Sequence, residues 1–185
     1  MGWRGRKMSF HTRSRVRRRP RQGTHNRHTI LERLRSLALS STERAAKARE
    51  AAELVRAARD YHWVGFYDVT AKEIAAIAWT GGKAPAFPRF PITRGLNGAA
   101  VSSRRHVVVQ DVTRDPRYLT TFGSTRGEAI FVVASPADGR IIGTIDVASD
   151  RPNAFTPDDE AFLGSCAEAL VSLWLSAPPP EKQAE

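Results

Sequence analysis

Apolar residues recur every three or four positions in the first third of the chain, and this period predicts two amphipathic helices. The first is expected over residues 29–39, where a capping box begins at Thr29. The second is expected over residues 42–61 and is opened by a similar box at Ser40. Both helices precede the first segment with a different period.

The same helical period returns near the end of the chain. Thr156 is a typical N-cap residue, Pro157 fits the first helical position, and three acidic residues follow in the first turn. The single cysteine, Cys166, lies on the apolar stripe of this last helix. We therefore predict that Cys166 is a small core residue rather than a reactive thiol.

Between the helical segments, apolar and polar residues alternate with the period of two that is typical of β-strands. The last two of these runs are joined by an Asp-Gly turn, which predicts a hairpin. The expected strands are residues 62–70, 72–82, 105–112, 128–135 and 139–149. Residues 83–95 contain three prolines and are expected to be extended or looped, and residues 97–103 to form a short helix. Hairpins beside long terminal helices predict an antiparallel sheet covered by helices, an α+β domain.

The net charge of +10 comes from one end of the 185-residue chain. Residues 1–28 contain ten Lys and Arg and no acid, whereas the rest has 19 basic and 19 acidic residues. We predict a disordered basic tail over residues 1–28, a single domain over residues 29–176 and a polar, Pro-rich tail over residues 177–185. The basic tail could instead contact nucleic acid, act as a targeting segment, or reflect a true start at Met8 or later.

Several classes of protein do not fit the sequence. No run of 18 apolar residues is present, so neither a membrane span nor a membrane partner is expected. One cysteine excludes an internal disulfide and a cysteine-based metal cage. We expect a cytoplasmic protein without a metal or a cofactor.

Asp146 is the most unusual polar residue, because it lies within an otherwise apolar strand. The alternation places Asp146 on the face opposite to Ile145 and Val147. A buried acid is costly unless it is paired. Asp146 could form an ion pair with an arginine or accept backbone N–H groups, or it could contact a ligand. The candidate arginines are Arg94, Arg126 and Arg140.

Asn97 stands between Gly95 and Gly98 at the start of the short predicted helix. Its side-chain oxygen could accept from backbone N–H groups and so cap the helix. It could also contact a ligand. Both interpretations stay open at this point.

The segments "RGLNGAAVSSRRHVVVQDVTRDPRYL" and "EAIFVVASPADGRIIGTIDVASDRPNAFTPDDEAFL" resemble GAF domains, over roughly residues 40–175. The resemblance implies a six-stranded antiparallel sheet with the terminal helices packed on one face. It also implies a small-molecule pocket on the other face and dimerisation through the terminal helices.

Within this family the sequence resembles the single-domain GAF proteins called free methionine-(R)-sulfoxide reductases, but it departs from them at the cysteines. The resemblance places their three cysteines at Phe87, Asn97 and near Thr121, where this chain has no thiol. A sulfoxide reductase needs an attacking thiolate and a resolving thiol. The pattern therefore indicates that thiol chemistry is missing.

Two of the acids that hold the substrate in those reductases are matched here by Glu128 and Asp146, and the third is replaced by Ala148. We expect a non-catalytic GAF-domain sensor or binding module, homodimeric, with a pocket for a small polar ligand. The alternatives are a divergent reductase-like enzyme and a structural dimerisation module whose basic tail contacts nucleic acid. The expected ligand-binding residues are Trp79, Asn97, Tyr118, Glu128 and Asp146.

Overall fold

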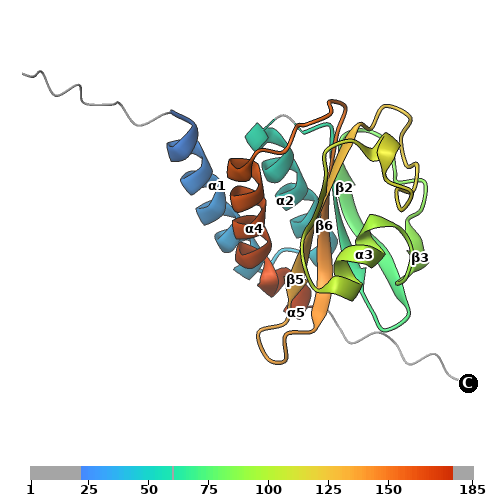
Figure 1. Ribbon diagram of the computed structural model, residues 1–185. Helices are drawn as coiled ribbons and strands as arrows, with labels where there is room; N and C mark the ends of the chain where they lie inside the picture. Colours follow the sequence, from blue (N-terminus) through green and yellow to red (C-terminus); the bar gives the residue numbers. More distant parts are fainter. Residues whose placement is uncertain (1–21, 60, 177–185) are drawn as a thin grey trace, which may run out of the picture.

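The computed structural model describes residues 22–59 and 61–176, which form one α+β domain around a six-stranded antiparallel sheet (Figure 1). The strand order is β3-β2-β1-β6-β5-β4, and every neighbouring pair is antiparallel. The strands are β1 Trp63–Val69, β2 Glu73–Thr80, β3 Arg89–Pro91, β4 Val107–Val109, β5 Gly127–Ala134 and β6 Ile141–Ser149. The fold class predicted from the sequence is confirmed.

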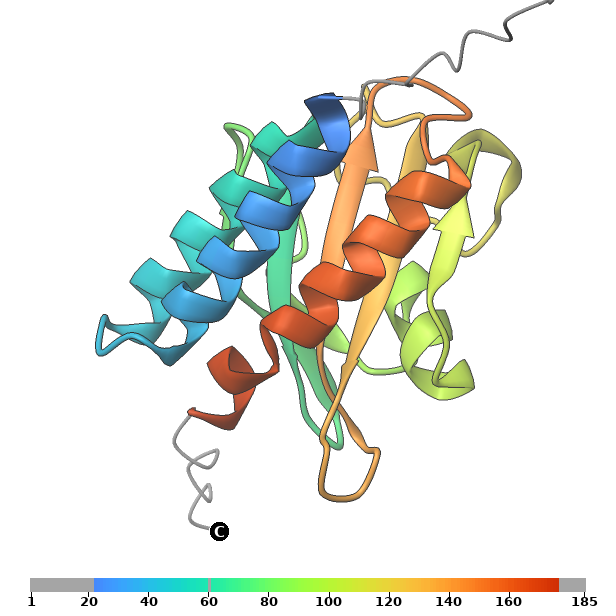
Figure 2. The same ribbon diagram turned by 90° about the vertical axis from the view of Figure 1, so that its left-hand side faces the viewer.

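Helices cover both faces of the sheet, but unequally. The first two and the last long helix lie side by side on one face, and α3 covers the other face (Figures 1 and 2). The helices are α1 Gln22–Leu39, α2 Arg44–Arg59, α3 Gly95–Ser103, α4 Pro157–Ala169 and α5 Val171–Leu175, with a short 3₁₀ turn, η1, at Val112–Arg114. None of the described helices is long and apolar enough to cross a membrane.

Alternation along the strands builds two apolar cores, one on each face of the sheet. Ile145 and Val147 of β6 belong to the core under α1, α2 and α4, together with Cys166 of α4. Ala148 of β6 belongs to the core under α3. The faces predicted for β6 and the core position predicted for Cys166 are therefore confirmed.

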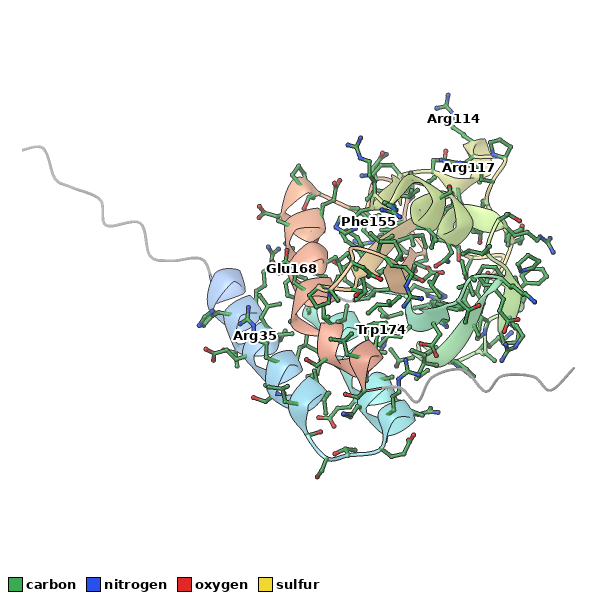
Figure 3. All side chains as sticks on the ribbon, turned by 90° about the horizontal axis from the view of Figure 1, so that it is seen from below. Arg35, Arg114, Arg117, Phe155, Glu168 and Trp174 are labelled. Atoms are coloured by element: carbon green, nitrogen blue, oxygen red, sulfur yellow. The ribbon has the colours of Figure 1, made fainter. Side chains whose placement is uncertain are left out.

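Trp174 fixes the short helix α5 beneath the sheet (Figure 3). A Cβ atom at Gly143 would lie only 1.9 Å from Nε1 of Trp174, so the indole ring occupies the space that a side chain on β6 would need. Nε1 of Trp174 donates to the backbone oxygen of Tyr67 at 3.0 Å. α5 is thereby tied to two central strands, β1 and β6.

The helix starts differ in part from those predicted. α1 begins at Gln22, so Thr29 lies within the helix rather than at its cap, and the boundary predicted at residue 28 falls inside α1. The side chain of Glu43 accepts from the backbone N–H of Ala46 at 3.0 Å and caps α2, whereas the hydroxyl of Ser40 donates back to α1. Residues 1–21 and 177–185, where basic and Pro-rich tails were predicted, lie outside the described residues.

The predicted start of the last helix is confirmed. Thr156 accepts from the backbone N–H of Asp159, and the carboxylate of Asp159 accepts from the backbone N–H of Thr156, which together form a capping box. Asp159 also pairs with Arg59 at 3.0 Å and accepts from the hydroxyl of Tyr61. Its role is therefore to hold α2 and α4 together.

Candidate functional site

A cavity lies between the sheet and α3, on the face opposite to the terminal helices. Its volume is about 20 Å³, which is room for roughly one water molecule. Residues from β1, β3, β5, β6, α3 and two loops converge on it. The lining residues are Tyr67, Phe87, Phe90, Gly95, Leu96, Asn97, Leu119, Thr121, Glu128 and Asp146.

Asn97 connects α3 to the centre of the sheet. The helix begins at Gly95 with Arg94 at the N-cap position and no side-chain cap, so the capping role considered for Asn97 is wrong. Nδ2 of Asn97 donates to Oδ2 of Asp146 at 3.0 Å, and the hydroxyl of Thr144 donates to Oδ1 of Asn97 at 2.6 Å. All three side chains are buried, and they form a polar bridge across an apolar face.

Asp146 lies in the middle of β6, opposite Gly65 of β1 and Ile130 of β5. The amide of Asn97 is the hydrogen-bond donor that the structure gives to its carboxyl group. Burial raises the pKa of Asp146 to about 7, and the hydrogen bond from Asn97 acts in the opposite direction. Asp146 is therefore partly protonated near neutral pH.

None of the three arginines considered as partners forms an ion pair with Asp146. Arg126 donates to the carbonyl oxygens of Gly123 and Thr125, Arg140 pairs with Asp138, and the guanidinium of Arg94 lies over the ring of Phe87. These contacts are all local to the loops that carry the arginines. The carboxyl group of Asp146 is held by a neutral amide instead of a cation.

Glu128 is the second carboxyl group in the cavity. It lies near the start of β5, is only 9% exposed, and has no hydrogen-bond or ion-pair partner within residues 22–59 and 61–176. Burial, and after it the negative charges of Asp146 and Asp115, raise the pKa of Glu128 well above its ordinary value. Two neighbouring acids thus share a buried site, and no cation among the described residues pairs with them.

Tyr67 of β1 also faces the cavity, although it was not among the predicted site residues. Burial raises the pKa of Tyr67, and the charges of Asp146 and Glu128 raise it further, so its phenol stays protonated. The period of two in β1 places Tyr67 on the same side as Trp63, and this was the signal in the sequence.

Two predicted site residues lie outside the cavity lining. Trp79 of β2 stands opposite Gly65 and packs, partly buried, against the α3-side core. Tyr118 packs against the same core, and its hydroxyl donates to the backbone oxygen of Phe122 at 3.4 Å. Contact between these two residues and a ligand stays a prediction.

One wall of the cavity comes from the loop between η1 and β5, through Leu119 and Thr121. A Cβ atom at Gly95 would approach Cδ1 of Leu119 to 2.8 Å, so the loop packs closely on the first residue of α3. The start of the loop carries Arg114 and Arg117, which project at the edge of the molecule far from α1 (Figure 3). Arg117 pairs with Asp115 at 2.6 Å.

The three positions at which the resemblance places the reductase cysteines come together in this cavity, as Phe87, Asn97 and Thr121. None of them can form a thiolate. Cys166 lies on the other side of the sheet, fully buried, and burial raises the pKa of its thiol. In the part of the chain that the structure describes, no group of three or more His, Cys, Asp or Glu residues could hold a metal ion.

The chain belongs to the GAF domain family, whose sequence profile matches residues 39–173. It is 26% identical to protein YtsP of Bacillus subtilis over 142 residues, which cover 76% of this chain and 86% of the relative. It is also similar to the free methionine-R-sulfoxide reductase of Saccharomyces cerevisiae, at 29% identity over 113 residues, which cover 60% of this chain and 62% of the enzyme.

Solved structures give the same picture. The free methionine-R-sulfoxide reductase of Neisseria meningitidis, in complex with its substrate, superposes with a TM-score of 0.74 at 27% identity and covers 85% of this chain and 93% of its own. A putative GAF sensor protein of Burkholderia vietnamiensis superposes with a TM-score of 0.73 at 26% identity, covering 81% and 94%. Both reductases and sensors are thus among the relatives.

Proposed function

We propose that this chain is a non-catalytic GAF-domain binding module or sensor whose cavity takes a small ligand with a cationic amine. The observation that carries the proposal is the carboxyl group of Glu128, which is buried beside Asp146 and has no partner within the described residues. Perturbed acids in a concave site are typical of functional sites.

A ligand cation would supply what the protein lacks. A buried carboxylate is stable only when it is paired or hydrogen-bonded, and an ammonium group would satisfy Glu128 and Asp146 together. Binding would then favour the ionised forms of both acids and release protons. Affinity for a cationic ligand is therefore expected to rise as the pH increases through about 7, the pKa of Asp146.

The size of the cavity sets a condition on binding. A space of about 20 Å³ cannot hold an amino acid, so the wall must move outward when a ligand enters. Phe87 is the most exposed of the lining side chains, and Leu119 and Thr121 come from a loop. These three residues are the part of the wall that can yield without disturbing the sheet.

The cysteine positions support a role without thiol chemistry. Reduction of a sulfoxide by thiol exchange needs a thiolate at the substrate. At the positions where the resemblance places the reductase cysteines, this cavity has Phe87, Asn97 and Thr121, none of which carries a thiol. We expect no methionine to form when the protein is incubated with free methionine-(R)-sulfoxide and a dithiol. Methionine formation in proportion to protein concentration, retained in Cys166→Ala, would favour a reductase with another chemistry.

Native mass spectrometry of the full chain tests the binding proposal. We expect a reproducible adduct on the wild-type protein that is absent from its denatured mass. Glu128→Gln should lose this adduct, whereas the matched control Glu50→Gln, an exposed acid on α2, should keep it. An adduct that survives in Glu128→Gln and Asp146→Asn would show that the ligand binds elsewhere.

We also propose that two copies pair through the terminal helices. Leu39 at the end of α1 and Leu175 at the end of α5 are large apolar residues that are 76% and 54% exposed. A contiguous apolar patch on a surface marks a protein–protein interface, and pairing of two copies through the terminal helices would cover both leucines. Light scattering after size exclusion should give the mass of a dimer, and Leu39→Glu should shift it towards that of a monomer.

A further inference from the structure

A second, polar hollow lies at the end of the sheet where β1 begins and β6 ends. Its volume is about 370 Å³, and none of its lining residues belongs to the Glu128 cavity. α1 begins at the same end of the molecule (Figures 1 and 2). The lining residues are Arg56, Tyr61, His62, Asp150 and Arg151.

Arg56 is the unusual residue of this hollow. Its Nε atom is covered by protein but has no hydrogen-bond partner, and its guanidinium forms no ion pair within the described residues. Arg59, one turn later on α2, instead pairs with Asp159 at 3.0 Å. Buried donors in folded proteins are almost always satisfied, and an unmet one destabilises the fold. Arg56 is therefore a donor group that lacks its acceptor.

The rest of the lining adds positive charge. Arg151 follows β6, and its guanidinium has no partner among the residues that the structure describes. Among the lining residues that the structure describes, two are arginines and one, Asp150, is acidic. The imidazole of His62 completes the wall, with Nε2 at 3.3 Å from the hydroxyl of Ser124. The hollow therefore favours an anion.

His62 also lines a neighbouring hollow of about 490 Å³. Two loops form the rest of its wall, one with Lys83 and the other with Gly123. At Gly82 and Gly123 a Cβ atom would meet no other atom within 4 Å, so both loops leave open space above the backbone. This second hollow adds another cation and gives a larger anion room to extend. The cationic groups thus surround His62 from both sides.

We propose that Arg56, Arg151 and His62 form a binding site for a phosphate group. Guanidinium groups match the planar pairs of oxygens on a phosphate, and such charge-assisted bonds are among the strongest in proteins. A bound phosphate would give the guanidinium of Arg56 an oxygen acceptor and would neutralise Arg151. This site shares no lining residue with the cavity under α3, for which we propose a cationic ligand.

Calorimetric titration of the full chain with inorganic phosphate, at constant ionic strength, tests the site. Arg56→Gln and Arg151→Gln should each weaken binding by about ten-fold, the effect of one lost charge-assisted bond. Arg49→Gln is the matched control, because Arg49 is an exposed residue of the same helix and its removal changes the net charge equally. All variants keep the basic residues 1–28, so unspecific attraction by them is the same in each.

A spectroscopic signal makes the test specific to Arg56. The Nε–Hε resonance of Arg56, assigned by its loss in Arg56→Gln, should shift during the phosphate titration of the wild-type protein. Arg151→Gln changes only an exposed loop residue, so its weaker binding cannot be ascribed to unfolding. Equal affinity in both variants and in Arg49→Gln, with an unshifted Arg56 resonance, would overturn the proposal.

Two further titrations distinguish the kinds of molecule that could carry the phosphate group. A mononucleotide that binds at least as tightly as inorganic phosphate, with weak salt dependence, would identify a small phosphorylated metabolite. A short DNA strand that binds more tightly, with affinity falling steeply with salt, would identify a nucleic-acid backbone. In either case Arg56→Gln must weaken binding relative to Arg49→Gln, and equal binding in the two would contradict the site.

Discussion

The two faces of the sheet are formed by the same strands but differ in the side chains that they bury. On the face under α1, α2 and α4, Ile145 and Val147 of β6 pack among apolar neighbours. On the face under α3, Asp146, which lies between them in the sequence, is buried beside Glu128 without a cationic partner among the described residues. The first face buries apolar side chains that stabilise the fold, whereas the second also buries two acids at a cost in stability, which our proposal assigns to ligand binding.

The largest expected difference in unfolding free energy is between substitutions at two positions of β5, Phe131 and Glu128. Phe131→Ala should lower the free energy of unfolding by about 3–5 kcal/mol, because Phe131 is 1% exposed in the helix-covered core and leaves a cavity. Glu128→Gln, three residues earlier on the same strand, should leave stability unchanged or raise it, because it removes an uncompensated buried acid. Urea unfolding of both variants measures the contrast. A loss of unfolding free energy in Glu128→Gln as large as that in Phe131→Ala would contradict this prediction.

The next effect concerns the polar bridge. Asn97→Ala removes the donor to Asp146 and the acceptor for Thr144, and should cost about 1–3 kcal/mol of unfolding free energy. The pKa of Asp146 should rise further, because the hydrogen bond from Asn97 is what lowers it. Urea unfolding together with carboxyl NMR checks both effects. The exposed Ser102→Ala, on the same helix, is the control and should change neither.

A smaller effect should appear in the pH dependence of stability. Because the pKa of folded Asp146 is raised to about 7 from the ordinary 3.8, its contribution to stability is full below about pH 4 and is lost as the pH rises through 7. Glu128, whose pKa is also raised, acts in the same direction. The wild-type protein should therefore lose about 1–2 kcal/mol more between pH 6 and pH 8 than the double variant Glu128→Gln/Asp146→Asn through Asp146 alone, and Glu128 adds to this loss.

Urea unfolding at the two pH values measures this difference. The control is Asp138→Asn, which removes an exposed acid on the β5–β6 turn and should keep the wild-type slope. Equal slopes in the wild-type protein and the double variant would mean that the two acids are not protonated in the folded state.

The smallest effect is expected at Cys166. Cys166→Ala should cost about 1 kcal/mol through lost packing and leave ligand binding unchanged, because Cys166 is on the helix-covered face. In the native protein the thiol should resist iodoacetamide, since burial raises its pKa and blocks access. Rapid alkylation without unfolding would place the thiol at the surface and reopen the enzymatic interpretation.

Local patterns in the sequence were enough to predict most of the fold. The alternation in β6 placed Asp146 opposite Ile145 and Val147, and the capping residues of α4 located its start at Thr156; the structure confirms both. These features depend on neighbours within a few residues, which a single sequence contains. The glutamate cap of α2 was missed, because serine is the more common capping residue.

The site could be predicted only in part, because its contacts join distant segments. Asn97 looks like a cap in the sequence, but its two hydrogen bonds reach β6, nearly fifty residues away. Leu119 and Thr121 reach the cavity through the path of a loop, which a local period does not encode. Tyr67, in contrast, could have been placed there by the period of two in β1. The acids Glu128 and Asp146 were predictable because a charge within an apolar strand is itself a signal.

The measurement that tests the central claim most directly is an NMR titration of the side-chain carboxyl carbons of Glu128 and Asp146 in the ligand-free protein. We expect Asp146 to titrate with a pKa near 7 and Glu128 well above its ordinary value, because both are buried and neither pairs with a cation of the described residues. The exposed Glu50 should titrate normally and serves as the internal reference. If both acids titrated near their ordinary values, they would be solvated or paired, and the cavity would not be a site held open for a cationic ligand.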